Sequence, residues 1–381
     1  MKSVCLLGAT GSIGDSALEI IRQHPDEFIL HSVAAYSQWE KLAQIIKEFN
    51  VRRVCLFDET AAQALREYLG IPVLCGMSGL EELASDSEAD IVINALMGAV
   101  GGLPTLRAIH AGKHIALANK ETMVMAGPII QDALLENPNA KITPIDSEHN
   151  AIFQCLAGRP ASEVECLQIT ASGGPFRTWA FEKFSEITLE DALNHPVWSM
   201  GKKITIDSAS MMNKGLEVIE AHFLFGIPYE QIQVVVHPQS RVHSLVQFKD
   251  GNLMAQLGAP DMKIPIQAAL TWPLRLPLRT ERLHLAELKQ LTFEAPDFQK
   301  FPCLAIAYEA GKLGGVYPAM MNAANEVLVD AFLKRKIRFT DIPKYIETVM
   351  GKTPKIEKRL TLPQALEADA EARRLARELV Y

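Results

Sequence analysis

The chain has 381 residues, of which 48% are hydrophobic and 22% are charged, a balance typical of a globular enzyme rather than a disordered chain. This length exceeds one ordinary core and favours two or three domains. The formal net charge of −7 argues against a general nucleic-acid binder, which normally carries a basic surface.

Six cysteines are scattered through the sequence without a C-x-x-C pair. This usage fits thiols in a reducing compartment better than a disulfide framework or a zinc site. The first residues lack the longer apolar region of a secretory signal, and no apolar run is long enough for a membrane helix. We therefore expect a cytoplasmic protein that binds neither membranes nor nucleic acid.

Short apolar strands alternate with helical patterns from residue 1 to about residue 145. The expected strands are Val4–Leu7, Ile29–Ala35, Val54–Phe57, Ile91–Asn94, His114–Ala118 and Lys141–Ile145, and the expected helices are Ser16–Gln23, Trp39–Phe49 and Ala61–Tyr68. This alternation predicts an α/β fold with a Rossmann-like, doubly wound parallel sheet.

The pattern changes after residue 145. Strands are expected at Leu167–Thr170, Val234–His237, Ser244–Phe248 and Leu253–Leu257, a helix at Ser210–Phe225, and four further helices at Cys303–Lys312, Tyr317–Lys334, Asp341–Met350 and Pro363–Leu379. The turn sequence Lys249–Asn252 predicts a hairpin. We expect a nucleotide-binding domain at 1–145, a central α+β catalytic domain at 146–285, a linker at 286–300 and a C-terminal helical bundle at 301–381.

A glycine loop, Gly8-Ala-Thr-Gly-Ser-Ile-Gly14, follows the first expected strand and opens a helix. Glycines at this turn let backbone amides approach a pyrophosphate at the helix N-terminus. The spacing G-x-x-G-x-x-G differs from the commoner G-x-G-x-x-G, so a glycine turn without a ligand remains the alternative.

The end of the second expected strand reads Ala34-Ala35-Tyr36-Ser37-Gln38 and has no carboxylate. An acidic residue here would bind the ribose hydroxyls of NAD, so its absence favours NADP. Ser37, Gln38 or Lys41 would then contact the 2′-phosphate.

Acidic residues follow the strand that ends at Ile145. Asp146 and Glu148 share a face if that strand continues, and a hard cation such as Mg²⁺ or Mn²⁺ prefers such oxygen ligands. The alternative is a polar helix cap.

A third ligand is expected in the segment Ile206–Glu217, which we interpret as a strand end followed by a helix. Asn213 and Lys214 stand four and three residues before Glu217, so all three side chains can point into one cleft. Ser208 and Lys214 would bind a phosphate while Glu217 reaches the metal. A surface ion pair between Lys214 and Glu217 is the alternative.

Two more segments suit substrate binding. Ser172-Gly-Gly-Pro-Phe176 follows a strand and offers a hydroxyl and backbone amides to an anion. Asn194–Gly201, which includes His195 and Trp198, has a proline, a terminal glycine and large apolar groups, as expected of a lid. Ordinary core packing is the alternative for the lid.

At these residues the sequence resembles the 1-deoxy-D-xylulose 5-phosphate reductoisomerase family nearly from end to end. The motifs in question are Gly8–Gly14, Ala118-Asn-Lys-Glu121, Asp146-Ser-Glu-His-Asn150, Ser172–Phe176, His195–Gly201, Asp207–Glu217 and Asn322-Ala-Ala-Asn-Glu326. One departure lies at Tyr36-Ser37-Gln38, where family members usually have Gly followed shortly by Asn.

The resemblance implies a homodimeric, NADPH- and Mg²⁺- or Mn²⁺-dependent enzyme that acts on a small phosphorylated keto-sugar in non-mevalonate isoprenoid biosynthesis. It implies cofactor contacts from Gly8, Thr10, Gly11, Ser12, Ile13, Asn119, Glu121 and Gly201, and metal ligands Asp146, Glu148 and Glu217. It implies substrate contacts from Lys120, Ser147, Glu148, Ser172, His195, Ser208, Asn213, Lys214 and Glu217. Lys120, Glu148, His195, Trp198 and Glu217 are the expected catalytic residues, with dimerisation in the central domain.

Two other functions remain open on the sequence. One is an NADP-dependent sugar-phosphate or hydroxy-acid dehydrogenase that reduces without rearrangement. The other is a nucleotide-sensing regulatory protein without catalysis.

Overall fold

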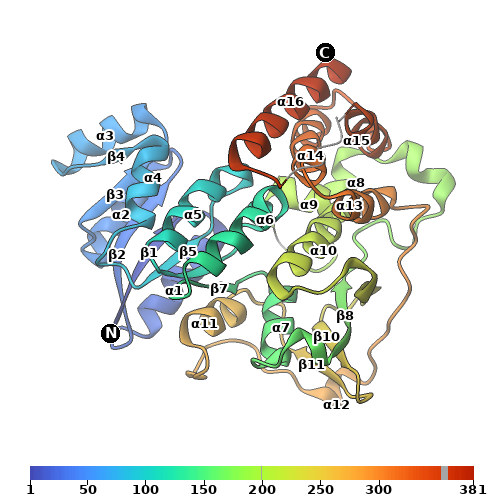
Figure 1. Ribbon diagram of the computed structural model, residues 1–381, viewed down its shortest axis with the longest axis horizontal. Coiled ribbons are helices and arrows are strands. Elements are labelled where there is room, and N and C mark those ends of the chain that lie inside the picture. The colour runs from blue at the N-terminus through green and yellow to red at the C-terminus, as the bar shows by residue number, and fades with distance from the viewer. Residues whose placement is uncertain (199, 353–358) are drawn as a thin grey trace. The chain divides into compact units, whose positions relative to one another are not determined.

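The computed structural model describes residues 1–198, 200–352 and 359–381 of the chain (Figure 1). These residues form two compact units, each assembled from several segments. Unit 1 contains residues 1–122, 130–150 and 261–280, and unit 2 contains residues 123–129, 151–260 and 281–381. From the sequence we expect boundaries between functional domains at residues 145, 285 and 300. These boundaries stay a prediction.

Unit 1 is built around a seven-stranded parallel sheet. Its strands are β1 (Lys2–Leu7), β2 (Phe28–Ala35), β3 (Arg53–Leu56), β4 (Leu74–Cys75), β5 (Ile91–Asn94), β6 (His114–Leu117) and β7 (Lys141–Pro144). The strand order is β4-β3-β2-β1-β5-β6-β7. The chain thus builds the sheet from β1 toward one edge and then returns beside β1 to build the other half, which confirms the doubly wound, Rossmann-like class.

Helices connect these strands. The connecting helices are α1 (Ser12–Gln23), α2 (Trp39–Phe49), α3 (Glu59–Leu69), α4 (Gly76–Ala84), α5 (Gly102–His110) after the short turn η1 (Gly98–Gly101), and α6 (Lys120–Glu136). Helix α7 (Ser147–Leu156) follows the last strand, β7, and α11 (Lys263–Thr271) comes later in the chain, after the second sheet. Helix α6 bends at Ala126, whose φ is −133°, two residues before Pro128. Proline lacks an amide proton and cannot continue the ladder of helical hydrogen bonds.

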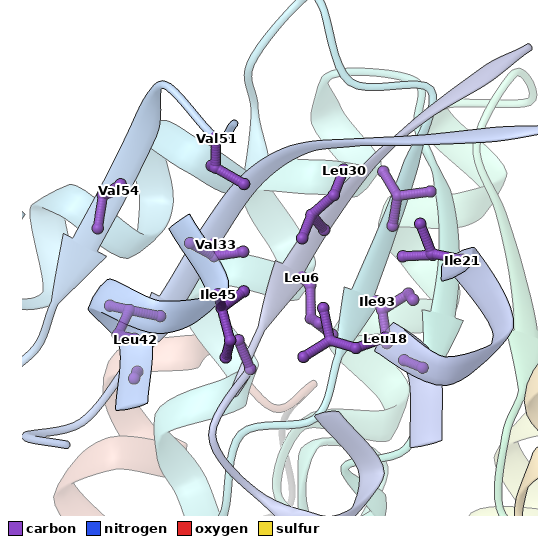
Figure 2. Close-up of a cluster of buried hydrophobic side chains, with 14 of the residues drawn as sticks. Leu6, Leu18, Ile21, Leu30, Val33, Leu42, Ile45, Val51, Val54 and Ile93 are labelled. Carbon is purple, nitrogen blue, oxygen red and sulfur yellow. The ribbon is translucent and has the colours of Figure 1, made fainter. Parts of the chain in front are cut away.

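The core of unit 1 fills the space between the sheet and its helices (Figure 2). The side chains labelled in the figure are Leu6, Leu18, Ile21, Leu30, Val33, Leu42, Ile45, Val51, Val54 and Ile93, and each is almost completely buried. Ile266 and Leu270 of α11 join the same cluster. Each such side chain contributes about 1.5–3 kcal/mol to the free energy of unfolding, so α11 is bound into unit 1 although it follows the second sheet in the sequence.

Unit 2 contains a four-stranded sheet. Its strands are β8 (Val164–Ala171), β9 (Ile232–Val236), β10 (Val242–Phe248) and β11 (Leu253–Leu257), in the order β11-β10-β8-β9. Strand β10 pairs antiparallel with β8 and β11, and β8 pairs parallel with β9. The predicted hairpin is confirmed, since β10 and β11 are joined at Gly251, whose φ of +88° suits glycine.

The helices of unit 2 include the four that the sequence predicts near its end. They are α8 (Leu189–Leu193), α9 (Lys202–Ala209), α10 (Met212–Phe225), α12 (Leu285–Leu288), α13 (Pro302–Leu313), α14 (Tyr317–Leu333), α15 (Asp341–Gly351) and α16 (Leu362–Val380), with short turns η2 (Ala161–Glu163), η3 (Phe181–Glu186) and η4 (Tyr229–Gln231). Helix α14 packs against α13, α15, α16 and α9 (Figure 1). Within the described parts of the chain, no helix is both long and apolar enough to cross a membrane.

Candidate active site

The glycine loop lies between β1 and α1, where the sequence predicts it. Gly8 has a φ of +92°, and a Cβ there would stand 2.4 Å from the carbonyl oxygen of Ala95, the residue after β5. A Cβ at Gly14 would stand 2.5 Å from the carbonyl oxygen of Ala9. Only glycine therefore lets the loop pass this close to β5 and turn directly into α1.

The start of α1 leaves its amide groups open. Gly11 is the N-cap residue, it has no side-chain cap, and both Gly11 and Ser12 are exposed. Lys41 holds the loop in place, because its ammonium donates to the Thr10 carbonyl at 3.0 Å and pairs with Asp15 at 2.8 Å. Uncapped amides at a helix N-terminus fit a pyrophosphate.

Aromatic rings border the neighbouring strand ends. Tyr36 follows β2 and is 65% exposed, and its ring stacks on Phe57, which follows β3, with centroids 5.4 Å apart. Ser37 and Gln38 come next and are exposed. The segment that departs from the usual family pattern thus presents an aromatic surface followed by two polar side chains at the carboxyl edge of the sheet.

Asn119 is buried at the end of β6 and caps α6. Its Oδ1 accepts from the Thr122 amide at 2.9 Å, and its Nδ2 donates to the carbonyls of Leu96 at 2.6 Å and Gly98 at 2.9 Å. Asn119 therefore fixes the loop after β5, a structural task beside its expected cofactor contact. Glu121 lies in the first turn of α6.

In the acidic segment the strand does not continue, and the alternative of a polar helix start is confirmed. Strand β7 ends at Pro144 and α7 begins at Ser147, so Asp146 precedes a helix and Glu148 lies in its first turn. The Asn150 amide fixes this turn by donating to the Pro144 carbonyl at 2.8 Å. A carboxylate in the first helical turn is stabilised by the open backbone amides, so helix formation wins over strand continuation.

Lys120 pairs with Asp146 within unit 1, and both side chains are largely buried. Ser147 donates to the Glu148 carboxylate. The sequence interpretation missed His149, which is completely buried with its Nδ1 3.8 Å from the Asp146 carboxylate. Its position inside the motif Asp146–Asn150 was the available signal.

The segment around Ser208 is helical, so the expected strand end at Ile206 is also wrong. Residues Lys202–Ala209 form α9, and Met211, with a φ of +60°, makes the sharp turn into α10. The β-branched run Ile204-Thr-Ile206 resembles a strand, but Ile206 is buried against neighbouring helices. Tertiary packing here overrides local propensity.

The sequence predicts that Asn213, Lys214 and Glu217 of α10 lie together, and the structure confirms it. The Asn213 amide and the Lys214 ammonium each donate to one oxygen of the Glu217 carboxylate. Lys214 and Glu217 are almost completely buried, which rules out a solvated surface pair. A buried carboxylate needs this kind of compensation.

The expected lid residue His195 contacts Ser172. The Nδ1 of His195 accepts from the Trp198 amide at 2.8 Å, so the neutral ring carries its proton on Nε2, which donates to the Ser172 hydroxyl oxygen at 3.1 Å. Burial lowers the pKa of His195 and favours this neutral ring. The Gly174 amide donates to the same oxygen at 3.2 Å. The Ser172 proton is thereby left to donate to a ligand.

The remaining expected residues of this segment lie beside α9. Trp198 is half-buried, and Gly201 is the exposed N-cap of α9, where an added Cβ would meet nothing within 4 Å. Ser199, which falls inside the predicted lid and the motif His195–Gly201, lies outside the described residues.

Each unit thus holds a buried carboxylate paired with a lysine, and unit 1 adds an open glycine loop on a Rossmann-like sheet. Carboxylate oxygens fit a hard divalent cation, and open loop amides fit a dinucleotide. These features are those of a dinucleotide-dependent enzyme whose carboxylates can hold a divalent cation.

Three family models match the chain. They are 1-deoxy-D-xylulose 5-phosphate reductoisomerase at residues 4–127, its C-terminal domain model at residues 142–225, and the DXP reductoisomerase C-terminal domain at residues 257–375. The 1-deoxy-D-xylulose 5-phosphate reductoisomerase of Geobacillus sp. (strain WCH70) is 51% identical, and that of Chlorobaculum tepidum 49%, with 100% of both chains covered in each case. The chain belongs to the 1-deoxy-D-xylulose 5-phosphate reductoisomerase family.

Solved structures agree with this family membership. The Zymomonas mobilis reductoisomerase in complex with NADPH has a TM-score of 0.92 at 43% identity, covering 100% of this chain and 99% of that one. A DOX-P reductoisomerase in complex with NADPH, fosmidomycin and magnesium has a TM-score of 0.95 at 41% identity, covering 100% and 98%.

Proposed function

We propose that this chain converts 1-deoxy-D-xylulose 5-phosphate to 2-C-methyl-D-erythritol 4-phosphate with NADPH and a divalent metal, a step of non-mevalonate isoprenoid biosynthesis. The observation that carries the proposal is the pair of buried carboxylate–lysine contacts, Asp146 with Lys120 and Glu217 with Lys214, in a full-length member of the family.

Asp146, Glu148 and Glu217 are the proposed metal ligands. Their hard oxygen donors suit Mg²⁺ or Mn²⁺, and a related structure contains magnesium. The metal supplies Lewis-acid polarisation of the substrate oxygens. The ammonium groups of Lys120 and Lys214 balance the charges of two of these carboxylates, Asp146 and Glu217.

Ser172, Ser208, Asn213 and Lys214 are the proposed contacts of the substrate phosphate. The Ser172 oxygen already accepts from His195 and Gly174, so its hydroxyl proton donates to the phosphate. Lys214 adds a positive charge at a buried position. Binding energy from the phosphate is remote from the reacting carbons and is available to order the lid.

The proposed cofactor contacts lie in two regions. Gly8, Thr10, Gly11, Ser12 and Ile13 would hold the pyrophosphate, and Asn119, Glu121 and Gly201 would lie near the nicotinamide end. Ser37 and Gln38 would contact the 2′-phosphate. Lys41 is engaged by Thr10 and Asp15, so we assign it to loop positioning rather than to direct phosphate binding.

The reaction has an isomerisation part and a reduction part. The carbon chain of the substrate rearranges to a branched aldehyde without gain or loss of atoms, and the aldehyde then gains one hydride and one proton. NADPH supplies the hydride. Lys120, Ser147 and Glu148 orient the substrate hydroxyls, while His195 and Trp198 exclude water, which strengthens the electrostatic interactions in the site.

We also propose that the protein is a cytoplasmic homodimer. Strand β11 forms an edge of the second sheet and exposes Leu253, Met254 and Leu257. A hollow of about 490 Å³ lies beside it, lined in part by Arg159 and Phe248. An unprotected apolar edge strand favours pairing with another chain, and a second copy of this chain is the occupant that the homodimer requires.

The first test mixes the purified protein with 1-deoxy-D-xylulose 5-phosphate and NADPH, with and without Mg²⁺ or Mn²⁺, and follows the loss of NADPH absorbance. We expect metal-dependent oxidation and a branched methylerythritol phosphate product in the carbon NMR spectrum. An unbranched reduced product would instead indicate a sugar-phosphate dehydrogenase. NADPH binding without oxidation would indicate the nucleotide-sensing protein.

A further inference from the structure

One motif has no role in the proposed chemistry: Asn322-Ala-Ala-Asn-Glu326, which lies in α14. Asn322 and Asn325 are both 0% exposed, on a helix whose other buried residues are mostly apolar. Burying an amide is unfavourable unless it is hydrogen-bonded. The partners of these side chains therefore indicate what the motif does.

Asn325 is bonded to a buried carboxylate on α9. Its Nδ2 donates to Oδ1 of Asp207 at 2.8 Å, and Asp207 is 1% exposed. The other oxygen of Asp207 pairs with the ammonium of Lys203, one turn earlier on α9, at 2.9 Å. The Asp207 carboxylate is thus held by α14 on one side and by its own helix on the other.

The rest of the motif fixes α14 elsewhere. The Asn322 amide donates to Glu326 at 3.2 Å, and Arg373 of α16 pairs with Glu326 at 2.6 Å. Figure 1 shows α14 beside α16 and next to α9. Asn325 is therefore the member of the motif that reaches α9.

Asp207 stands at the base of the turn that carries the proposed phosphate contacts. It directly precedes Ser208, and its carbonyl accepts from the Ser210 hydroxyl at 3.2 Å. The Met212 amide donates to the same hydroxyl at 3.3 Å and begins α10. A shift of Asp207 would move Ser208 and the start of α10 together.

A second contact couples this turn to the glycine segment after β8. A Cβ at Gly174 would stand 2.9 Å from the Ser208 carbonyl oxygen. The backbones of the two segments that supply the proposed phosphate contacts Ser172 and Ser208 therefore touch. Little room exists for Ser208 to move without disturbing Gly174.

The Asp207 carboxylate is buried beside a proposed phosphate-binding serine, and Lys203 offsets its negative charge. Buried charged groups contribute weakly to stability, and their attested use is to specify geometry. We propose that Asn325 and Asp207 form a positioning pair that sets the α9–α10 turn for the substrate phosphate. This inference rests on the proposed function, because it assumes that Ser208 and Lys214 bind that phosphate.

The test compares two matched variants on one helix, Asn325→Leu and Asn322→Leu. Both replace a completely buried amide by an apolar group, but only Asn325 bonds to Asp207. We expect Asn325→Leu to raise KM for the substrate, and the inhibition constant of inorganic phosphate, by about tenfold or more. NADPH affinity should stay unchanged, and Asn322→Leu should change none of the three.

A pair exchange guards against a simple folding defect. N325D places two carboxylates together and should weaken phosphate inhibition further, whereas the double variant D207N/N325D again places an amide on a carboxylate and should recover most of it. Circular dichroism and melting temperature confirm folding. If Asn325→Leu and Asn322→Leu lower the melting temperature equally and leave phosphate inhibition unchanged, Asn325 stabilises the fold but does not position the phosphate site.

Lys214→Gln separates this inference from the proposed function. If wild-type protein is inhibited by phosphate and Lys214→Gln is not, the phosphate assignment stands and Asn325→Leu decides the inference alone. If Lys214→Gln and the wild type are inhibited equally, the phosphate assignment itself is wrong.

Discussion

Lysine side chains pair with two of the proposed metal ligands of this protein. Lys120 pairs with Asp146, and Lys214 pairs with Glu217. A carboxylate that is buried without such a partner would take up a proton rather than stay charged. The two ammonium groups therefore offset the charge of two of the three proposed metal ligands, Asp146 and Glu217.

We expect Glu217→Gln to lower kcat by at least about 100-fold even at saturating Mg²⁺, because a neutral amide replaces a charged ligand and the bound metal is then held and oriented less well to polarise the substrate. Steady-state kinetics with a metal titration measure this. Glu230→Gln, at an exposed glutamate in the same unit, is the control and should retain wild-type turnover. Near-normal turnover in Glu217→Gln would remove Glu217 from the ligand set.

A second residue-scale prediction concerns Gly8. Gly8→Ala would force a Cβ to within 2.4 Å of the Ala95 carbonyl, whereas a Cβ at Gly70, which also has positive φ, meets nothing within 4 Å. Gly70→Ala should lower the free energy of unfolding by about 1 kcal/mol through φ alone. Gly8→Ala should lower the free energy of unfolding by more than Gly70→Ala does, and it should also weaken NADPH binding. Urea denaturation and NADPH titration measure both, and equal effects in the two variants would contradict the close approach.

Single residues differ in how well the sequence predicts them. The Asn213, Lys214 and Glu217 contacts follow from helical spacing alone, because all three lie on α10. The Asn325–Asp207 contact joins residues 118 positions apart. No periodic pattern encodes such a pair, so it emerges only from the fold.

At the scale of elements, the prediction succeeded where the residue pattern agrees with the final conformation. Helices α2 and α14 and strands β5 and β11 lie within one residue of their expected bounds. It failed at β4, which has only two residues, and at α9, where a β-branched run is helical. Strand β4 is too short to carry a pattern. At α9, packing against α8, α10 and α14 decides the conformation.

The pairing of β6 with β7 leads to a pH prediction. The Nε2 atom of His114 on β6 lies 3.0 Å from the Thr143 hydroxyl of β7. Burial, with the nearby cations Lys141 and Lys2 adding to the effect, lowers the pKa of His114 from 6.5 to about 3. Below pH 6.5 the unfolded chain takes up a proton that the folded protein refuses, so the free energy of unfolding falls as pH falls toward about 3.

Urea denaturation across this pH window measures how steeply the free energy of unfolding depends on pH. His114 alone raises this slope by up to about 1.4 kcal/mol per pH unit. His114→Gln keeps a hydrogen-bonding group but does not titrate, so its free energy of unfolding should depend less on pH. His110→Gln, at the exposed end of α5, should keep the wild-type slope. An unchanged slope in His114→Gln would show that the buried ring does not govern this window.

At the scale of the whole molecule, the exposed edge strand β11 predicts the oligomeric state. Leu253→Lys should raise the dimer dissociation constant at least about tenfold, since a charged lysine at a sheet edge opposes strand pairing. Analytical ultracentrifugation measures this. Leu313→Lys, at an exposed leucine of α13 in the same unit, should leave the dimer intact. A wild-type protein that sediments as a monomer would contradict the proposal outright.

The order in which the segments of Asp207 and Asn325 are synthesised has a consequence for the nascent chain. Asp207 emerges 118 residues before Asn325, a delay of roughly 6 to 24 s at typical synthesis rates of about 5–20 residues per second. During that interval the turn that is proposed to bind the phosphate lacks its hydrogen bond from Asn325 of α14. The Asp207–Asn325 contact, and with it the proposed positioning of the phosphate-binding turn, can therefore form only after α14 has been synthesised.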